Sequence, residues 1–382
     1  AYSNSYDVVL RNAKAYMDGV QQSKMAVCGK HFPGDGGEGL DQHLVMGVND
    51  LDCDTWDKTF GRVYKSMIDA GLQTIMVGHI ALPKYSRKLR PGIKDEEIMP
   101  ATLAPELLQD LLRGQLGFNG LILTDASHMA GMTTSAPRSY QVPGAIAAGA
   151  DMYLYFNDHE EDFQYMMDGY KNGLITEERL SDALHRILGL KASLGLHRKK
   201  ANGTLVPKKE GLSVIGCEEH KQYAKKAAER TITLVKDTTK NLPITPQTHP
   251  RLKVYVVSTP PVDRNYAPDP AKEVIREELE AAGFQVTIHR TFYDMERENS
   301  NPMNRIYAMA GESVEKFKET YDAVLMFVNV KGYAQENTTR IRWASGHSNE
   351  IPWYTSEIPT VAISLNYTTH LLDLPMMKTY IN

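Results

Sequence analysis

Short apolar runs alternate with segments of helical periodicity through the first 200 residues of this chain. Helical patterns cover residues 8–20 and 105–115, and further helices are expected to end near residues 71 and 149. We interpret the apolar runs as buried strands over residues 25–32, 73–79, 120–125 and 151–156. Strands that alternate with helices at this spacing predict βα units and a parallel sheet. The expected fold class is therefore α/β.

A helix and a polar linker mark the end of this region. Thr176 is a favoured N-cap residue, acidic residues follow it, and Gly195 is suited to end the helix. Residues 199–212 then contain several lysines and a glycine, which is typical of an exposed linker. We expect residues 1–198 to form one domain and residues 199–212 to connect it to a second domain.

Residues 213–382 carry a second α/β pattern. A helix is expected over residues 273–282, and Gly283 is suited to end it. Strands are expected over residues 252–258, 285–289, 323–328 and 360–365. The short spacing between these elements predicts a small doubly wound domain.

Composition and charge argue against several classes of protein. The chain has 382 residues and a net charge of -4, which suits two globular domains and gives no electrostatic reason to expect nucleic acid or an anionic membrane as partner. No run reaches the roughly 20 apolar residues of a membrane span. Cys28, Cys53 and Cys217 are too scattered for a disulfide framework and lack zinc-ligand spacing, so no metal site is expected. No signal peptide is visible, and cytoplasmic and secreted locations both stay open.

Polar residues follow the first expected strand in a glycine-rich loop. The run Lys-His-Phe-Pro-Gly occupies residues 30–34, Asp35 follows it, and Asp-Gln-His occupies residues 41–43. Catalytic residues of α/β barrels lie at such strand ends and in the loops after them. Taken alone, Lys30 is equally well explained as a solvated lysine, and the pair of Asp41 and His43 as a surface ion pair.

A second candidate lies at the end of the third apolar run. Asp125 closes this run within the sequence Thr-Asp-Ala-Ser-His-Met over residues 124–129. A carboxylate is costly inside a core, so it belongs at the strand end, where it can serve as a nucleophile. The alternative for a lone aspartate here is a helix N-cap.

Together these segments resemble glycoside hydrolase family 3, in particular its bacterial β-N-acetylglucosaminidase branch. That branch carries a Lys-His-Phe-Pro-Gly run, then an Asp-x-His pair, and a Thr-Asp-Ala-x-x-Met strand end. This chain matches at residues 30–34, 41–43 and 124–129, and the similarity continues more weakly to residue 382. It departs from the family pattern at Asp35, where the family usually has histidine.

The resemblance implies roles for the matched residues. Asp125 is the expected nucleophile of a retaining mechanism, His43 the expected acid/base, and Asp41 its orienting partner. A glycine-rich loop can let this pair move onto the substrate. No metal ion or organic cofactor is expected. The expected substrate-binding residues are Lys30, His31, His79 and Met129.

The resemblance also implies an architecture. The catalytic domain is expected to be a (β/α)8 TIM barrel, followed by an α/β sandwich domain. Only four barrel strands are found where a closed barrel has eight. Residues 1–198 are therefore expected to be the C-terminal part of a barrel, whose other half is supplied by another chain or lies outside this sequence. Residues 213–382 are expected to form a sandwich domain that is incomplete at its C-terminus.

The activity implied by the resemblance is retaining hydrolysis of terminal β-linked N-acetylhexosamine, as in peptidoglycan or chitin fragments. The expected partner is a small carbohydrate substrate. A phosphorylase or a β-glucosidase of the same family is the enzymatic alternative, because a histidine acid/base adds no second carboxylate to repel phosphate. A carbohydrate-binding protein that has lost turnover is the third possibility, since a fold alone does not imply a function.

Overall fold

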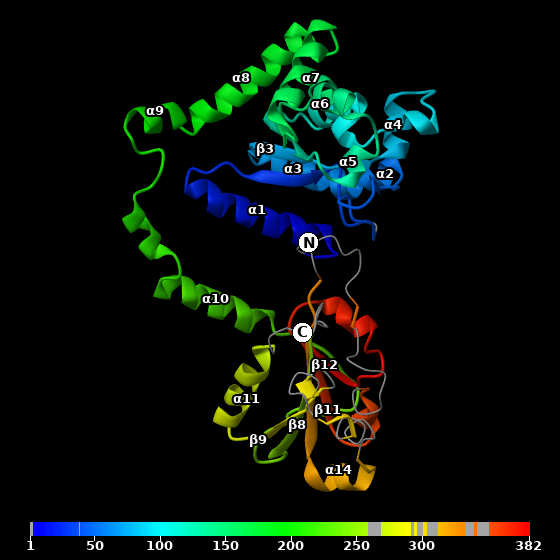
Figure 1. The fold of residues 1–382 in the computed structure, drawn as a ribbon, viewed down its shortest axis with the longest axis vertical. Coiled ribbons are helices and arrows are strands. Elements are labelled where there is room, and N and C mark those ends of the chain that lie inside the picture. Colours follow the sequence, from blue (N-terminus) through cyan, green and yellow to red (C-terminus); the bar gives the residue numbers. More distant parts are fainter. Residues whose placement is uncertain are drawn as a thin grey trace. The chain divides into compact units, whose positions relative to one another are not determined.

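The computed structural model describes residues 3–37, 39–258, 269–291, 294–295, 301–303, 312–332, 340–341 and 351–382. The chain divides into two compact units, Ala1–Lys208 and Lys209–Asn382, and each has its own sheet (Figure 1). The boundary falls within residues 199–212. This stretch also holds the end of helix α9 (Leu196–Ala201) and the start of a 3-10 helix (Lys209–Val214), so it is partly helical.

The first unit is built on a four-stranded sheet with the order β1-β3-β5-β6, in which neighbouring strands are parallel. Phe32 pairs with Val77, and Val77 with Thr124, so the carboxyl ends of β1, β3 and β5 lie together. All four expected strands are confirmed. They are β1 (Cys28–Phe32), β3 (Thr74–Val77), β5 (Leu121–Ala126) and β6 (Met152–Leu154).

A short parallel pair that the apolar pattern does not predict follows two of these strands. It consists of β2 (Gly47–Val48) and β4 (Ile80–Ala81). Because two-residue strands carry too few side chains to show an alternation, they leave no signal in the sequence. The pair joins the segments that follow β1 and β3.

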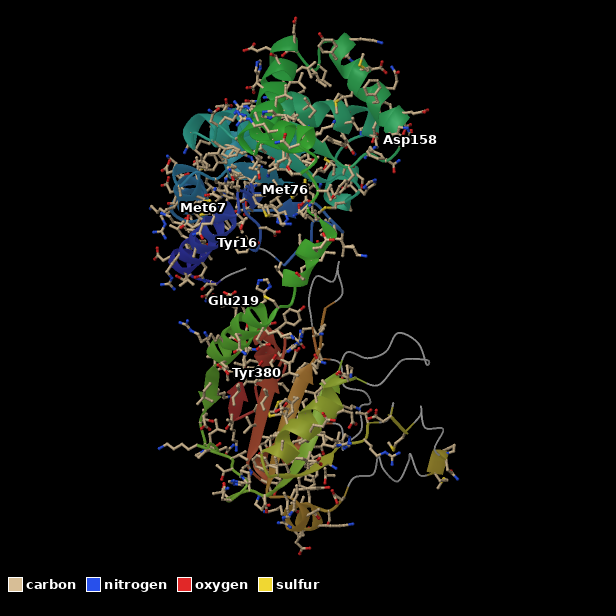
Figure 2. All side chains as sticks on the ribbon, turned by 90° about the vertical axis from the view of Figure 1, so that its left-hand side faces the viewer. Tyr16, Met67, Met76, Asp158, Glu219 and Tyr380 are labelled. Carbon is tan, nitrogen blue, oxygen red and sulfur yellow. The ribbon has the colours of Figure 1, made fainter. Side chains whose placement is uncertain are left out.

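Helices in the first unit bury apolar stripes against the sheet. Met17 of α1 is fully buried, whereas Tyr16 beside it is exposed (Figure 2). Met67 of α3 lies in the same buried cluster as Phe32 and Ile75 of the sheet. The α-helices are α1 (Tyr6–Gln22), α2 (Cys53–Trp56), α3 (Arg62–Asp69), α4 (Pro83–Leu89), α5 (Ala130–Thr133), α6 (Arg138–Ala148), α7 (His159–Lys171) and α8 (Glu177–Ser193). Two further segments, Asp57–Gly61 and Glu106–Gln115, wind as π-helices.

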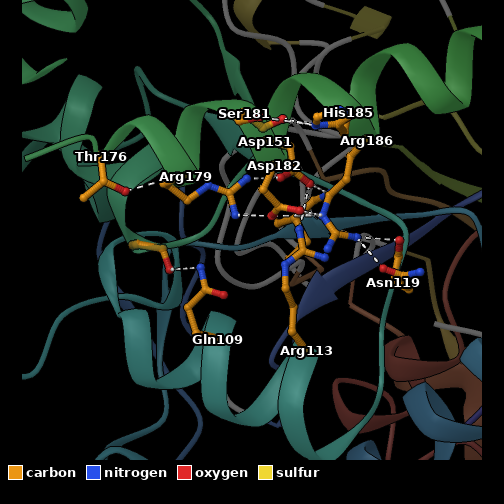
Figure 3. A network of polar contacts seen from close by, with 12 residues as sticks. Gln109, Arg113, Asn119, Asp151, Thr176, Arg179, Ser181, Asp182, His185 and Arg186 are labelled. Atoms are coloured by element: carbon orange, nitrogen blue, oxygen red, sulfur yellow. Dashed lines mark hydrogen bonds and ion pairs between the residues drawn. The ribbon is translucent and has the colours of Figure 1, made fainter.

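Helix α8 begins and ends as its sequence predicts. The Thr176 hydroxyl accepts a hydrogen bond from the Arg179 N–H at 3.1 Å, and Gly195 has the left-handed conformation with φ +66°. The helix brings Arg179, Asp182 and Arg186 to the amino ends of β5 and β6, as Figure 3 shows.

Asp151 is the centre of this network. Its carboxylate accepts hydrogen bonds from Arg113 Nη2 at 2.8 Å, Arg179 Nη2 at 2.5 Å and the Ile122 N–H at 2.8 Å. The Asp151 side chain is fully buried, so these three donors replace its hydration. The network fixes α8 and residues 106–115 to the amino-terminal ends of β5 and β6, whereas Asp125 lies near the carboxyl end of β5.

The second unit contains a six-stranded mixed sheet with the order β7-β12-β11-β10-β8-β9. The four strands expected here are confirmed as β8 (Arg251–Ser258), β9 (Gln285–Ile288), β10 (Ala323–Asn329) and β11 (Thr360–Ser364). At one edge β7 (Leu234–Asp237) pairs antiparallel with β12 (Thr379–Ile381), which is itself parallel to β11; neither β7 nor β12 was expected from the sequence. An antiparallel edge on an otherwise parallel sheet is common in such folds.

Both faces of the second sheet are covered. Ile275 of α11 (Ala271–Ala281) packs with Val254 and Leu325 in one buried cluster. Phe317 of α14 (Val314–Thr320) packs with Met326 in another. A further helix, α10 (Glu218–Thr231), precedes β7. Among the described residues, no helix is both long and apolar enough to cross a membrane.

Candidate active site

The candidate residues gather at the carboxyl edge of the first sheet. His31 lies near the end of β1, His79 follows β3, and Asp125 lies near the end of β5. Parallel strands in register bring these ends together, which is where α/β enzymes place their catalytic groups. Lys30 precedes His31 and is exposed.

His31 lies between two carboxylates. Its Nε2 is 3.4 Å from Asp125 Oδ2, and its Nδ1 is 3.3 Å from Asp35 Oδ2. The hydrogen bond from His31 lowers the pKa of Asp35 and outweighs the opposing effect of burial. Asp125 also accepts the Ala126 N–H at 2.7 Å, and its side chain is 14% exposed. The nucleophile candidate is thus oriented by a ring and a backbone donor while it still reaches solvent.

Asp41 and His43 form a hydrogen-bonded pair, here called the dyad. Asp41 Oδ1 accepts from the His43 backbone N–H at 2.9 Å and contacts the ring Nδ1 at 2.7 Å. Burial opposes ionisation of Asp41, but these hydrogen bonds outweigh it and lower its pKa. An ionised Asp41 assigns the proton to Nδ1, which leaves Nε2 of His43 to give or take a proton. The His43 side chain is 48% exposed, as proton exchange with a substrate requires.

The dyad is docked through its backbone. The carbonyl of His43 accepts from the Ala130 N–H at 3.0 Å, and that of Gln42 accepts from the Gly131 N–H at 3.1 Å. The buried side-chain oxygen of Gln42 accepts the His79 N–H at 2.8 Å. Glycines with positive φ, Gly34 and Gly36, precede this docked segment. The glycine-rich stretch is therefore separate from the anchored residues 41–43.

His79 is fully buried and has protein partners at both ring nitrogens. Nε2 lies 2.9 Å from the Ala126 carbonyl, and Nδ1 lies 2.9 Å from Thr102 Oγ1. Burial lowers the pKa of His79 and so favours the neutral ring, in which Nε2 donates to the Ala126 carbonyl. In this structure both ring nitrogens thus face protein groups.

Met129 is also buried, where a sugar-pocket position was expected. Its carbonyl accepts the Met132 N–H at 2.9 Å and the Thr133 N–H at 3.0 Å, so it begins α5. Lys30, His31, Asp125 and the dyad remain as groups that solvent can reach. Within the described part of the chain, no group of three or more His, Cys, Asp or Glu side chains could hold a metal ion.

The supporting residues Gln42 and Thr102 are not singled out by the sequence. A glutamine between two motif residues and a threonine in a connecting segment carry no chemical signal of their own. Their roles become visible only when the fold brings them against His79. The contact between His31 and Asp35 joins residues only four apart, but His31 lies in a strand, where this spacing predicts no contact.

Comparison with known proteins gives the relatives of this chain. Residues 1–190 match the glycosyl hydrolase family 3 N terminal domain. A β-N-acetylglucosaminidase/β-glucosidase of Cellulomonas fimi is 41% identical over 369 residues, which cover 96% of this chain and 62% of that protein. The chain belongs to glycoside hydrolase family 3. The resemblance seen in the sequence is thereby confirmed.

Other relatives match less of the chain or match it less closely. A β-hexosaminidase of Methylobacillus flagellatus is 32% identical over 161 residues, which cover 42% of this chain and 43% of that protein. The solved structure of the β-glucoside phosphorylase BglX superposes with a TM-score of 0.88 at 37% identity, covering 100% of this chain and 65% of that one. This family 3 chain thus spans less than two thirds of the relatives that match it along its length.

Proposed function

We propose that this chain carries the catalytic residues of a retaining β-N-acetylhexosaminidase. The observation that carries the proposal is that Asp125 and the dyad are both positioned by the segment that runs from β5 to α5. Asp125 lies near the end of β5, and the dyad is docked on α5, the helix that follows the same strand. A carboxylate and an imidazole held in this way supply a nucleophile and a proton carrier for double displacement.

The proposed reaction has two steps. Asp125 attacks the anomeric carbon and forms a glycosyl ester, while the bond to the leaving oxygen breaks and His43 gives that oxygen a proton. His43 then takes a proton from water, whose oxygen attacks the anomeric carbon and releases Asp125. Retaining enzymes usually employ a second carboxylic acid for the proton transfers. Imidazole, with an ordinary pKa of about 6.5, suits the same task near neutral pH.

His31 and Lys30 complete the proposed sugar site. Lys30 is exposed on β1, and His31 lies beside Asp125, so Lys30 can donate hydrogen bonds to hydroxyls of a bound sugar directly, and His31 can do so by exchanging its contact with Asp35 or Asp125 for one with the sugar. His79 belongs to the support of the site in this proposal, because both of its ring nitrogens are used inside the protein. The preference for N-acetylhexosamine is supported by the names of the Cellulomonas and Methylobacillus relatives.

Phosphorolysis is the second candidate reaction. Its support is the similarity to the β-glucoside phosphorylase BglX along the whole chain. In the second step a phosphate oxygen would attack the anomeric carbon in place of water and release Asp125. Asp35 and Asp41 each contact a histidine, His31 and His43, and a protonated histidine would offset the repulsion between its carboxylate and an anion.

Product analysis with and without phosphate tests both candidates. A hydrolase releases free sugar at a rate that phosphate leaves unchanged. A phosphorylase gives sugar 1-phosphate and speeds up as phosphate is added. Binding of the glycoside without any product contradicts both reactions and supports the carbohydrate-binding alternative. Glucoside and N-acetylglucosaminide substrates in parallel decide the sugar.

We also propose that the first sheet is half of a (β/α)8 barrel. Phe32, Ile75 and Ile122 point into the helix-covered core. Met76 and Leu123 alternate with them on the other face and are only partly buried. Such a face suits the interior of a barrel, where further strands would cover it. In this proposal the covering half comes from further residues of the protein or from another chain.

A further inference from the structure

Gln42 lies between Asp41 and His43 and is the most buried residue of the dyad segment, residues 41–43. Gln42 is 5% exposed, although both neighbours reach solvent. Its side-chain Oε1 accepts the His79 N–H at 2.8 Å, and its carbonyl accepts the Gly131 N–H at 3.1 Å. Neither bond involves the side chain of Asp41 or His43, so Gln42 holds the segment without occupying the groups proposed for chemistry.

Two glycines leave the space that Gln42 fills. A Cβ added at Gly78 would lie 3.0 Å from Gln42 Oε1 and 3.0 Å from the Cβ of His31. A Cβ added at Gly131 would lie 2.9 Å from the Cβ of His79 and 3.0 Å from the Gln42 carbonyl oxygen. Any larger residue at either position would push against Gln42 or its partner. The close approach on two sides fixes the place of residue 42.

The anchors of Gln42 also border the nucleophile strand. His79, which donates its backbone N–H to Gln42, contacts the Ala126 carbonyl through its ring at 2.9 Å. Ala126 follows Asp125, and α5 with Gly131 begins a few residues later. One chain of hydrogen bonds therefore runs from the dyad segment through Gln42 and His79 to the residue beside Asp125.

We propose that Gln42 is a positioning residue that fixes the dyad relative to Asp125. The dyad then acts as a docked unit. A neutral amide suits this task because it accepts a buried N–H without adding a charge beside Asp41 and His43. The inference rests on the proposed function, since it assumes that His43 carries the proton.

The test compares substrates with good and poor leaving groups in the full-length protein. A poor leaving group needs the proton of His43, whereas an activated phenolate departs without it. Gln42→Ala should lower kcat/KM for the poor leaving group by about 10- to 100-fold, because a displaced proton donor loses its alignment. The activated substrate should lose much less. Gln42→Asn keeps a neutral amide that can accept a backbone N–H and should retain more activity on the poor leaving group than Gln42→Ala, whereas Gln42→Glu adds a buried charge and should not rescue.

Gln141→Ala is the matched control. Gln141 is another buried amide, and it donates to the carbonyls of Met132, at 3.1 Å, and Ala136. It has no hydrogen bond to the dyad, so its removal should affect both substrates alike. Circular dichroism checks that each variant is folded. If Gln42→Ala does not fold, Gly131→Ala replaces it in the test. The methyl group added at residue 131 would press on the Gln42 carbonyl, so this variant should show the same selective loss.

His43→Ala separates the two ways in which the experiment can fail. If His43→Ala itself shows no dependence on the leaving group, the proposed function is wrong. If His43→Ala is selective while folded Gln42→Ala or Gly131→Ala loses equally on both substrates, or loses nothing, the positioning role of Gln42 is overturned and the proposed function stands.

Discussion

His31 Nε2 lies 3.4 Å from Asp125 Oδ2, although the two residues belong to strands that are separated by β3. The same ring contacts Asp35 at 3.3 Å through Nδ1. A histidine between two carboxylates can donate to both when it carries two protons. Asp35 stands where the family usually has histidine, so in this chain a carboxylate from the glycine-rich loop contacts the His31 ring. The contact joins the Lys-His motif to the proposed nucleophile.

The dyad should show a kinetic signature of proton transfer. His43→Ala should slow substrates with poor leaving groups most, by about 100-fold or more, and activated substrates least. Added azide should restore the second step, because a small anion needs no general base. Asp41→Ala should be milder, since the loss of an orienting group leaves the proton carrier in place. Steady-state kinetics on a leaving-group series, with and without azide, measure this. Equal losses along the series and no effect of azide would remove His43 from the role.

The buried network around Asp151 should matter for stability rather than catalysis. Asp151→Ala leaves Arg113 and Arg179 buried without their carboxylate, which should lower the free energy of unfolding by about 3 kcal/mol. The exposed pair of Arg87 and Asp95 is a suitable control, and Asp95→Ala should change little. Chemical denaturation measures both variants. Equal effects of the two substitutions would contradict the assignment.

Asp162 should give a pH dependence of stability. It accepts two hydrogen bonds from Arg138, at 2.8 and 2.5 Å, and one from the Asn157 N–H at 2.7 Å. Burial opposes ionisation, but these bonds outweigh it and lower the pKa of Asp162. A lowered folded-state pKa contributes stability above the ordinary value of about 3.9 and loses it as pH falls through the folded value.

The corresponding variant is Asp162→Asn. At pH 7 it should be less stable than the native chain by about 1.5–3 kcal/mol, the range for hydrogen bonds to a charged group. The difference should shrink once the pH falls below about 4. Asp162 then takes up a proton in the unfolded state of the unsubstituted protein, which lowers its stability, whereas the variant has no carboxylate to protonate at this site. Urea denaturation at several pH values follows the difference. A gap that stays constant down to pH 3 would contradict the assignment of Asp162.

The sequence predicts the four strands of the first sheet and four of the six in the second, because their apolar runs are long enough to be recognised, whereas the short strands β7 and β12 are missed. The apolar run of β5 is followed by Asp125, and this position together with the segment at residues 30–43 indicates the catalytic edge of the sheet. The sequence also predicts the local pair of Asp41 and His43, which are two residues apart. Contacts between distant segments leave no such pattern. The burial of His79 depends on Thr102 and Ala126, and the docking of Gln42 depends on Gly131, so neither is visible before the chain is folded.

The central claim is that Asp125 forms a covalent bond to the sugar. The most direct measurement is trapping with a β-linked substrate that carries fluorine beside the anomeric carbon and an activated leaving group, followed by mass spectrometry of the digested full-length protein. Asp125→Ala, which should be folded and inactive, serves as the unlabelled control. We predict one sugar adduct per chain on the peptide that contains Asp125, and none in the variant. An adduct on Asp35, Asp41 or any other carboxylate would contradict the account.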